Sequence, residues 1–332
     1  MELNFVMNQM TALRYFIPLI IEGNSRGIKS RIFVLPCGKY NCPSHFVKDI
    51  NELSKKYNID LHPFEEIRNY SGIMFFVESA CMKNVTAITD PQLYKKVILT
   101  YMINYSLEYE KYIKEATYVV FPSKFMESSY KLELLDKEKH ICLGSPKYDI
   151  SFNKEEIYKK YNIDARSPQP KIAFIIMPKA RDFTSINFKI LLEVFDELGY
   201  ETITKTRGKD PFSKEFHGNY HFVDYSWYPH DSMDLMHVSD LVVNFGSTAI
   251  KECVMLKKPI INFDIKPFKD CLQILCEQEH CVNLNMESTK EEIKEAIICL
   301  DNKPLDDEFD KSIEKYLFTG NSSKRILDFL GF

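Results

Sequence analysis

A short polar turn, Gly246–Ser247–Thr248, combines residue types that bind phosphate. The glycine lets the backbone approach a ligand closely, and the two hydroxyls can cap a following helix. A helix N-terminus presents unpaired N–H groups and a partial positive charge, which favour an anion. Glu252 lies one helical turn after Thr248, where its carboxylate can accept hydrogen bonds from both hydroxyls of a ribose. This pattern indicates a nucleotide diphosphate, but a packed βαβ unit with a capped helix produces it too.

The segments around this turn predict how it is positioned. An apolar, β-branched run at 241–244 reads as a strand, and a helix is expected at 248–256. Lys257–Lys258–Pro259 ends that helix before a second strand at 260–263. A strand–turn–helix–strand unit of this kind builds a parallel sheet.

Two basic loops follow the first two strands expected in the same half of the chain. Lys179 and Arg181 follow a strand that starts at 171, and Lys205 and Arg207 follow or end the next. Ligands of open α/β sheets collect at the carboxyl ends of the strands. The loops therefore predict a positive cup for a diphosphate, or else solvated surface charge. Arg207 is the strongest candidate, because a guanidinium pairs with phosphate through two hydrogen bonds.

The spacing Gly246…Glu252, followed by Lys258–Pro259–Ile260–Ile261, resembles the donor-nucleotide loop of GT-B glycosyltransferases. It is similar to the lipid II-forming N-acetylglucosaminyltransferase and to capsule and teichoic-acid transferases, including enzymes that use CDP-glycerol. The resemblance implies that the Gly246–Thr248 turn meets the diphosphate and that Glu252 holds the ribose. It implies a base pocket near Tyr225, and neither a metal nor another cofactor.

A second segment, Gly144–Ser145–Pro146–Lys147–Tyr148–Asp149, resembles a turn that closes the N-terminal domain of teichoic-acid-type transferases. The family fold is α/β, with two Rossmann-like domains that face a cleft and a C-terminal helix that returns to the first domain. We therefore expect an acceptor domain at 1–165 and a donor-binding domain at 166–332, with a linker in the polar, Pro-rich segment 151–170. The amphipathic segment 307–330 is the expected returning helix.

The catalytic base is harder to predict. A transfer that inverts the configuration at the anomeric carbon of the sugar needs a carboxylate or histidine near the acceptor hydroxyl. Some relatives use a histidine in the first loop, but Asn8–Gln9–Met10–Thr11 stands there. Asp90 is the first candidate, in a turn expected before a helix at 91–100, with Glu78 and His45 behind it. Retaining chemistry therefore stays open.

The composition excludes several classes of function. The net charge of −4 and a pI of about 6.1 give no sign of a nucleic-acid partner. The nine cysteines are odd in number and scattered, which argues against a disulfide framework. His230 and His237 are wrongly spaced for a metal pair. Without a signal peptide or a long apolar run, a cytoplasmic protein is expected, and contact with a membrane surface stays open.

The sequence therefore predicts a glycosyltransferase that moves a sugar from a nucleotide-diphosphate donor, first of all a UDP-sugar, to a glycan or lipid-linked acceptor in surface polysaccharide synthesis. One alternative is a polyol-phosphate transferase that uses CDP-glycerol. Another is a UDP-N-acetylglucosamine 2-epimerase, although the Gly-Thr-Arg-Pro-Glu start of that family is absent. A two-lobed binding protein without catalytic activity is the third.

Overall fold

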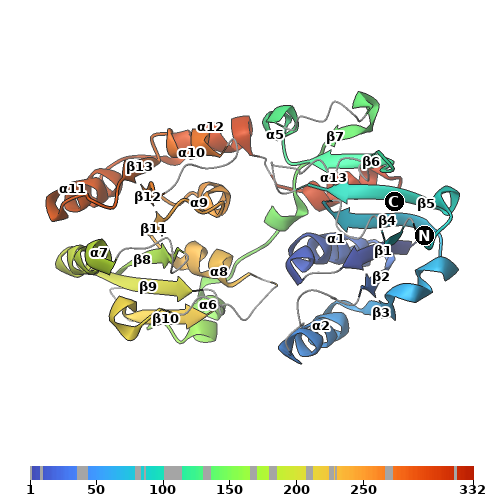
Figure 1. Ribbon diagram of the computed structural model, residues 1–332, viewed down its shortest axis with the longest axis horizontal. Coiled ribbons are helices and arrows are strands. Elements are labelled where there is room, and N and C mark those ends of the chain that lie inside the picture. The colour runs from blue at the N-terminus through green and yellow to red at the C-terminus, as the bar shows by residue number, and fades with distance from the viewer. Residues whose placement is uncertain are drawn as a thin grey trace. The chain divides into compact units, whose positions relative to one another are not determined.

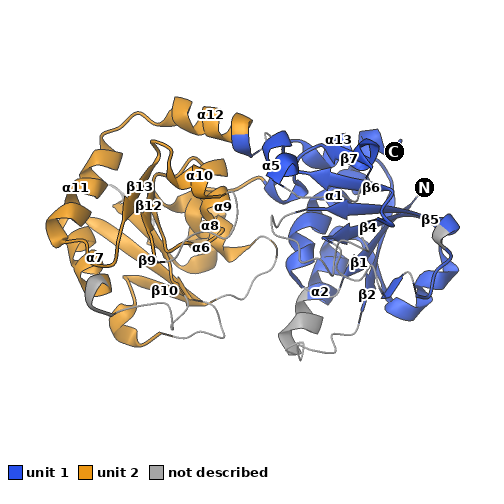
Figure 2. Ribbon diagram, turned by 45° about the horizontal axis from the view of Figure 1, so that its top comes forward, with its two compact units in different colours: residues 1–150, 316–332 blue, residues 151–315 orange. Residues whose placement is uncertain are grey.

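The computed structural model of the chain contains two compact units (Figure 2). Unit 1 comprises residues 1–150 and 316–332, and unit 2 comprises residues 151–315. The structure describes residues 2–7, 10–35, 44–78, 84–85, 87–100, 114–129, 136–164, 170–178, 185–206, 212–223, 228, 230–265, 272–317 and 320–332. Each unit is an α/β layer structure around one parallel sheet. None of the helices in these ranges is long and apolar enough to cross a membrane.

The sheet of unit 1 has seven parallel strands in the order β3-β2-β1-β4-β5-β6-β7 (Figure 1). The strand order reverses between β1 and β4, and this reversal is where open α/β sheets bind ligands. Phe5 of β1 stacks on Phe75 of β4 at 5.1 Å between ring centres, in the core of the sheet. The strands are β1 (Glu2–Met7), β2 (Lys29–Val34), β3 (Ile59–Pro63), β4 (Gly72–Val77), β5 (Tyr94–Leu99), β6 (Tyr118–Phe121) and β7 (His140–Cys142).

The described helices of unit 1 cover this sheet. Its α-helices are α1 (Leu13–Ser25), α2 (Ser44–Tyr57), α5 (Lys124–Ser129) and α13 (Ser322–Phe329). Its 3-10 turns are η1 (Met10–Ala12), η2 (Phe64–Asn69), η3 (Pro91–Leu93), η4 (Lys137–Lys139) and η5 (Pro146–Tyr148).

Unit 2 repeats the plan with six parallel strands in the order β10-β9-β8-β11-β12-β13. The order reverses between β8 and β11, which again marks the expected ligand edge. The strands are β8 (Lys171–Ile176), β9 (Tyr200–Thr206), β10 (Tyr220–Val223), β11 (Leu241–Asn244), β12 (Ile260–Phe263) and β13 (Cys281–Leu284). The helices are α6 (Lys154–Tyr161), α7 (Ser185–Glu197), η7 (Lys214–Phe216), α8 (Asp231–Val238), α9 (Ile250–Met255), α10 (Gln273–Cys276), α11 (Lys290–Asp301) and α12 (Asp306–Tyr316).

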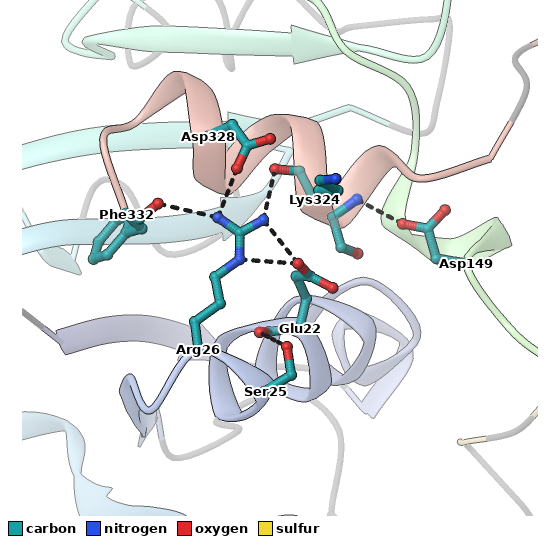
Figure 3. Close-up of polar contacts among 8 residues, drawn as sticks. Glu22, Ser25, Arg26, Asp149, Lys324, Asp328 and Phe332 are labelled. Atoms are coloured by element: carbon teal, nitrogen blue, oxygen red, sulfur yellow. Dashed lines mark hydrogen bonds and ion pairs between the residues drawn. The ribbon is translucent and has the colours of Figure 1, made fainter.

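The last helix, α13, packs on α1 of unit 1 (Figure 3). Arg26, just after α1, donates to the carboxylates of Glu22 and Asp328, each at 2.7 Å. It also donates to the Phe332 carbonyl at 3.0 Å. Asp149 accepts the N–H groups of Ser322 and Ser323 at the other end of α13. The two ends of the helix are therefore both tied to the N-terminal part of the chain.

Two expected parallel-sheet domains are confirmed, but two segments were predicted wrongly. Residues 91–100 were expected to form a helix, yet only η3 is helical there and β5 follows. Val97, Ile98 and Leu99 are buried, as in a central strand with both faces covered, and a short apolar run of this kind cannot be told from a helix by its periodicity.

The segment 151–170, expected to be a linker, contains α6. Asn153 caps that helix by accepting the N–H groups of Glu155 at 3.0 Å and Glu156 at 3.2 Å. Asn162 ends it in the left-handed region, with φ of 51°. The chain passes from unit 1 to unit 2 after Ile150, whereas the sequence placed the boundary at 165.

Candidate functional site

The Gly246–Thr248 turn lies at the carboxyl end of β11, between that strand and α9. Gly246 has φ of 59°, in the left-handed region that glycine adopts without steric cost. The Ser247 hydroxyl accepts the Ala249 N–H at 3.3 Å, which closes a tight side-chain turn. Neither hydroxyl caps the helix, because α9 begins only at Ile250 and its N-cap is Ala249. The predicted helix start at 248 is therefore two residues early.

A chain of hydrogen-bonded asparagine side chains on three neighbouring strands supports this turn. Asn244, Asn262 and Asn283 occupy matching positions in the neighbouring strands β11, β12 and β13. Asn244 Nδ2 donates to Asn262 Oδ1 at 2.9 Å, and Asn262 Nδ2 donates to Asn283 Oδ1 at 3.0 Å. Asn283 Nδ2 donates in turn to the Cys276 carbonyl at 2.7 Å. Each amide therefore serves both as donor and as acceptor.

The same asparagines fix two backbone N–H groups of the turn. Gly246 N–H donates to Asn262 Oδ1, and Ser247 N–H donates to Asn244 Oδ1, both at 3.3 Å. These N–H groups point into the protein. Thr248 is exposed, and its N–H and hydroxyl find no acceptor among the described residues. The Thr248 N–H and the hydroxyls of Ser247 and Thr248 therefore remain available as donors in the described part of the turn.

Glu252 lies in the first turn of α9, as the sequence predicts. Its side chain is largely enclosed, with 5% of the residue surface exposed, and the neighbouring Lys251 has 8%. Charged residues are this deeply buried in proteins only when paired.

The predicted basic cup is only partly visible. Lys205 is the penultimate residue of β9, at the same carboxyl edge as the Gly246 turn, and it is 7% exposed. Lys179, Arg181, Arg207 and Tyr225 lie outside the described residues.

Lys258, which the sequence placed in the donor-loop pattern, has a structural role in this unit. Its ammonium group donates to the carbonyls of His237 at 2.9 Å and Ser239 at 2.7 Å, at the end of α8. Burial lowers the pKa of Lys258. A cation at this position satisfies carbonyls that the helix leaves unpaired. This contact was missed from the sequence because α8 precedes the motif and only the fold brings them together.

The candidate bases in unit 1 lie at opposite edges of its sheet. Asp90 precedes β5, at the amino edge, where it is exposed and accepts the Gln92 N–H at 2.9 Å. Glu78 follows β4, at the carboxyl edge next to the reversal of strand order. It is 9% exposed and has φ of 56°, which only a few non-glycine residues adopt. His45 lies in α2, but its side chain is outside the described part.

A polar cluster that the sequence did not reveal lies at the edge strand of unit 1. Glu127 of α5 accepts from Lys124 at 2.7 Å, and it lies 3.2 Å from both His140 Nδ1 and Cys142 Sγ. Burial and the neighbouring carboxylate raise the pKa of Cys142 to about 12, so the thiol stays protonated and is a poor nucleophile. Among the described residues, no group of three histidines, cysteines or carboxylates is arranged to hold a metal ion.

Solved structures with the same fold cover nearly the whole chain. The UDP-GlcNAc 2-epimerase from Neisseria meningitidis bound to UDP-GlcNAc is 12% identical, with a TM-score of 0.65 and 99% of each chain covered. The glycotransferase of kitacinnamycin is 9% identical, with a TM-score of 0.64 over 99% of this chain and 98% of the other. The wall teichoic acid polymerase TagF is 12% identical, with a TM-score of 0.64 over 99% and 88%. The chain has the GT-B fold.

No protein-family model and no curated protein sequence matches the chain. The GT-B fold accounts for the two parallel sheets and for the reversal of strand order in each. It is shared by a glycotransferase, a 2-epimerase and a polymerase, so the activity has to be argued from the residues of the site.

Proposed function

We propose that the chain is a GT-B enzyme that transfers a sugar from a nucleotide-diphosphate donor, a UDP-sugar first of all, to a glycan or lipid-linked acceptor. The observation that carries the proposal is the Gly246–Thr248 turn at the carboxyl edge of the unit 2 sheet. There the exposed Thr248 and the hydroxyl of Ser247 offer donors to a diphosphate. Similar structures hold UDP-GlcNAc or UDP, which supports a nucleotide-sugar ligand.

The remaining donor contacts are proposed from the sequence and its resemblance to GT-B transferases. Glu252 is assigned to the ribose. Lys179, Arg181, Lys205 and Arg207 are assigned to the charge of the leaving diphosphate, in place of a metal, because cations near developing negative charge stabilise the transition state. Tyr225 is assigned to the base pocket.

Unit 1 is assigned to the acceptor, and Glu78 is preferred over Asp90 as the base. Glu78 is at the carboxyl edge, where ligands of such sheets bind, while Asp90 is at the amino edge. Glu78 also holds a backbone conformation that costs about 1–3 kcal/mol in a residue with a side chain, and such strain is concentrated at functional positions.

The second candidate is epimerisation of UDP-N-acetylglucosamine, which the similar epimerase structures favour. A third, transfer of glycerol phosphate from CDP-glycerol, is favoured by the similarity to TagF. The three reactions differ in what they do to the donor. An epimerase converts the UDP-sugar into its epimer without an acceptor. A glycosyltransferase releases UDP only when an acceptor is present. A polymerase of the TagF type releases CMP from CDP-glycerol.

The test is to incubate the purified protein with UDP-N-acetylglucosamine, UDP-glucose or CDP-glycerol, with and without a pool of polysaccharide and lipid-linked acceptors. Acceptor-dependent release of UDP supports the proposal. Epimer formation without an acceptor, or release of CMP, replaces it with the corresponding alternative. A catalytically silent protein that binds the donor contradicts enzymatic function.

A further inference from the structure

The turn that receives the proposed diphosphate is held in part by side chains of the neighbouring strands. Its first two N–H groups are bonded to side chains of the strands beneath it, Gly246 to Asn262 and Ser247 to Asn244. The helix that follows is only six residues long and has no side-chain cap. Local helix structure therefore contributes little to fixing the turn, because short helices are marginal by themselves.

Asn262 is the central member of this network. Its Oδ1 accepts from both Asn244 Nδ2 and Gly246 N–H, and its Nδ2 donates to Asn283. It is 2% exposed, and Asn244 is 0% exposed, so neither amide can replace a lost partner with bulk water. A buried amide that loses its partner is not compensated by water, so the network strongly favours the one arrangement in which every amide is paired.

The direction of the hydrogen bonds is also determined. Because the Cys276 carbonyl can only accept, Asn283 must present its nitrogen to that carbonyl and its oxygen to Asn262. Asn262 must then present its oxygen to Asn244 and Gly246. The carbonyl of Cys276 in α10 therefore determines the orientation of all three asparagine side chains. The chain of hydrogen bonds that starts there ends at the N–H groups of Gly246 and Ser247.

We propose that Asn262 is a positioning residue for the donor site. It holds the Gly246–Thr248 turn so that the Thr248 N–H and the two hydroxyls face the donor's phosphates, while Asn244 and Asn283 fix its own orientation. That the ligand is a nucleoside diphosphate rests on the proposed function. Asn262 itself does not contact the ligand in this account, so its effect is exerted through the turn.

The proposal separates phosphate affinity from nucleoside affinity. Loss of Asn262 misplaces only the phosphate-binding turn, so UDP should bind more weakly while uridine binds as before. One lost hydrogen bond of this kind corresponds to a loss of about tenfold in affinity. A general loss of structure would lower the affinities for UDP and uridine together.

The experiment is isothermal titration of the full chain with UDP and with uridine. The variants are Asn262→Ala and, one strand further from the turn, Asn283→Ala. The matched control is Asn4→Ala, which removes a buried asparagine of unit 1 that donates to Ser71 and Ile73 carbonyls. Amide hydrogen exchange at Gly246 and Ser247 is measured on the same proteins.

We expect Asn262→Ala to weaken UDP binding about tenfold and Asn283→Ala to weaken it about threefold, with uridine affinity unchanged in both and the control like wild type. Exchange at Gly246 should be faster in Asn262→Ala. Unchanged UDP affinity in a folded Asn262→Ala protein overturns the proposal, as does an equal loss for UDP and uridine. If Asn262→Ala does not fold, Asn283→Ala decides by the same criteria.

A wild-type protein that binds neither ligand overturns the proposed function and, with it, the role of Asn262 toward a diphosphate. The exchange data then report on the turn alone. Faster exchange in Asn262→Ala supports the positioning of the turn by Asn262, and equal exchange in wild type and variant overturns that as well.

Discussion

Asp149 accepts the backbone N–H of Ser322 at 3.1 Å, which joins residues 173 positions apart in the chain. The same carboxylate accepts the N–H of Ser323, so it occupies the N-terminus of α13, where a negative charge is favoured by the helix dipole. The Gly-Ser-Pro-x-x-Asp segment at 144–149 thus ends in a cap for a distant helix.

Replacing Asp149 by alanine should destabilise the packing of α13 on unit 1. The loss of a cap residue costs about 0.5–2 kcal/mol. Asp149→Asn should retain most of that, because its oxygen can still accept. Urea unfolding followed by circular dichroism measures the difference. Asp136→Ala is the control, since Asp136 precedes η4 without a side-chain cap bond. Equal stabilities of Asp149→Ala and the control would contradict the role of the cap.

The other end of α13 depends on the fork of Arg26. Its guanidinium reaches Glu22, Asp328 and the Phe332 carbonyl at once (Figure 3). A lysine cannot make these bonds together, so Arg26→Lys should increase hydrogen exchange in α13. Because Asp328 is half exposed, the loss should be about 1 kcal/mol and should shrink at high salt. Unaltered exchange in α13 would show that the hydrogen bonds of Arg26 do not hold this end of the helix.

Substitutions of Glu78 should separate its backbone strain from its proposed role as a base. Glycine adopts a φ of 56° without strain, whereas alanine does not. Both substitutions remove the carboxylate, so Glu78→Gly should be more stable than Glu78→Ala by about 1 kcal/mol. Both should lose transfer activity, by at least about a hundredfold for a lost general base.

Glu78→Gln and Asp90→Asn provide the catalytic comparison. The first should lose activity with little change in donor affinity, and the second should behave as wild type. Full activity of Glu78→Gln in the acceptor-dependent assay would remove Glu78 from the mechanism.

His280 should make unit 2 sensitive to acid. The ring is fully buried and stacks on Phe309 at 4.8 Å between ring centres. Burial lowers its pKa from 6.5 to about 4, so the unfolded chain binds this proton more tightly than the folded one. Stability should therefore fall as the pH drops from about 6.5 to 4, by at most about 1.4 kcal/mol per pH unit from this group.

Comparison of wild type with His280→Phe isolates that contribution, because all other titrating groups are shared. The difference in unfolding free energy between the two proteins should change between pH 7 and pH 5. A constant difference across this range would mean that His280 titrates alike in both states.

The sequence predicted the parallel sheets and the place of the Gly246 turn because both depend on local patterns. Buried runs such as 73–77 and 241–243 are apolar, and Gly246 comes shortly after the latter. The 91–100 segment was misread because its apolar residues satisfy helix and strand periodicity alike. Lys258 and Asp149 could not be assigned, since their partners lie far away in the sequence. The asparagine network was missed for the same reason: only strand register places 244, 262 and 283 side by side.

The most direct test of the account is the binding of nucleoside diphosphates to wild type and Glu252→Gln, measured by titration calorimetry and by thermal shift with UDP, CDP and GDP. The account predicts that UDP binds and, at about a hundred times its Kd, stabilises the protein by about 2.7 kcal/mol. It predicts that Glu252→Gln loses most of this affinity, while Glu277→Gln, an exposed glutamate of the same unit, does not. A folded wild-type protein that binds none of the three would contradict the assignment of the Gly246 turn and Glu252 to a donor nucleotide.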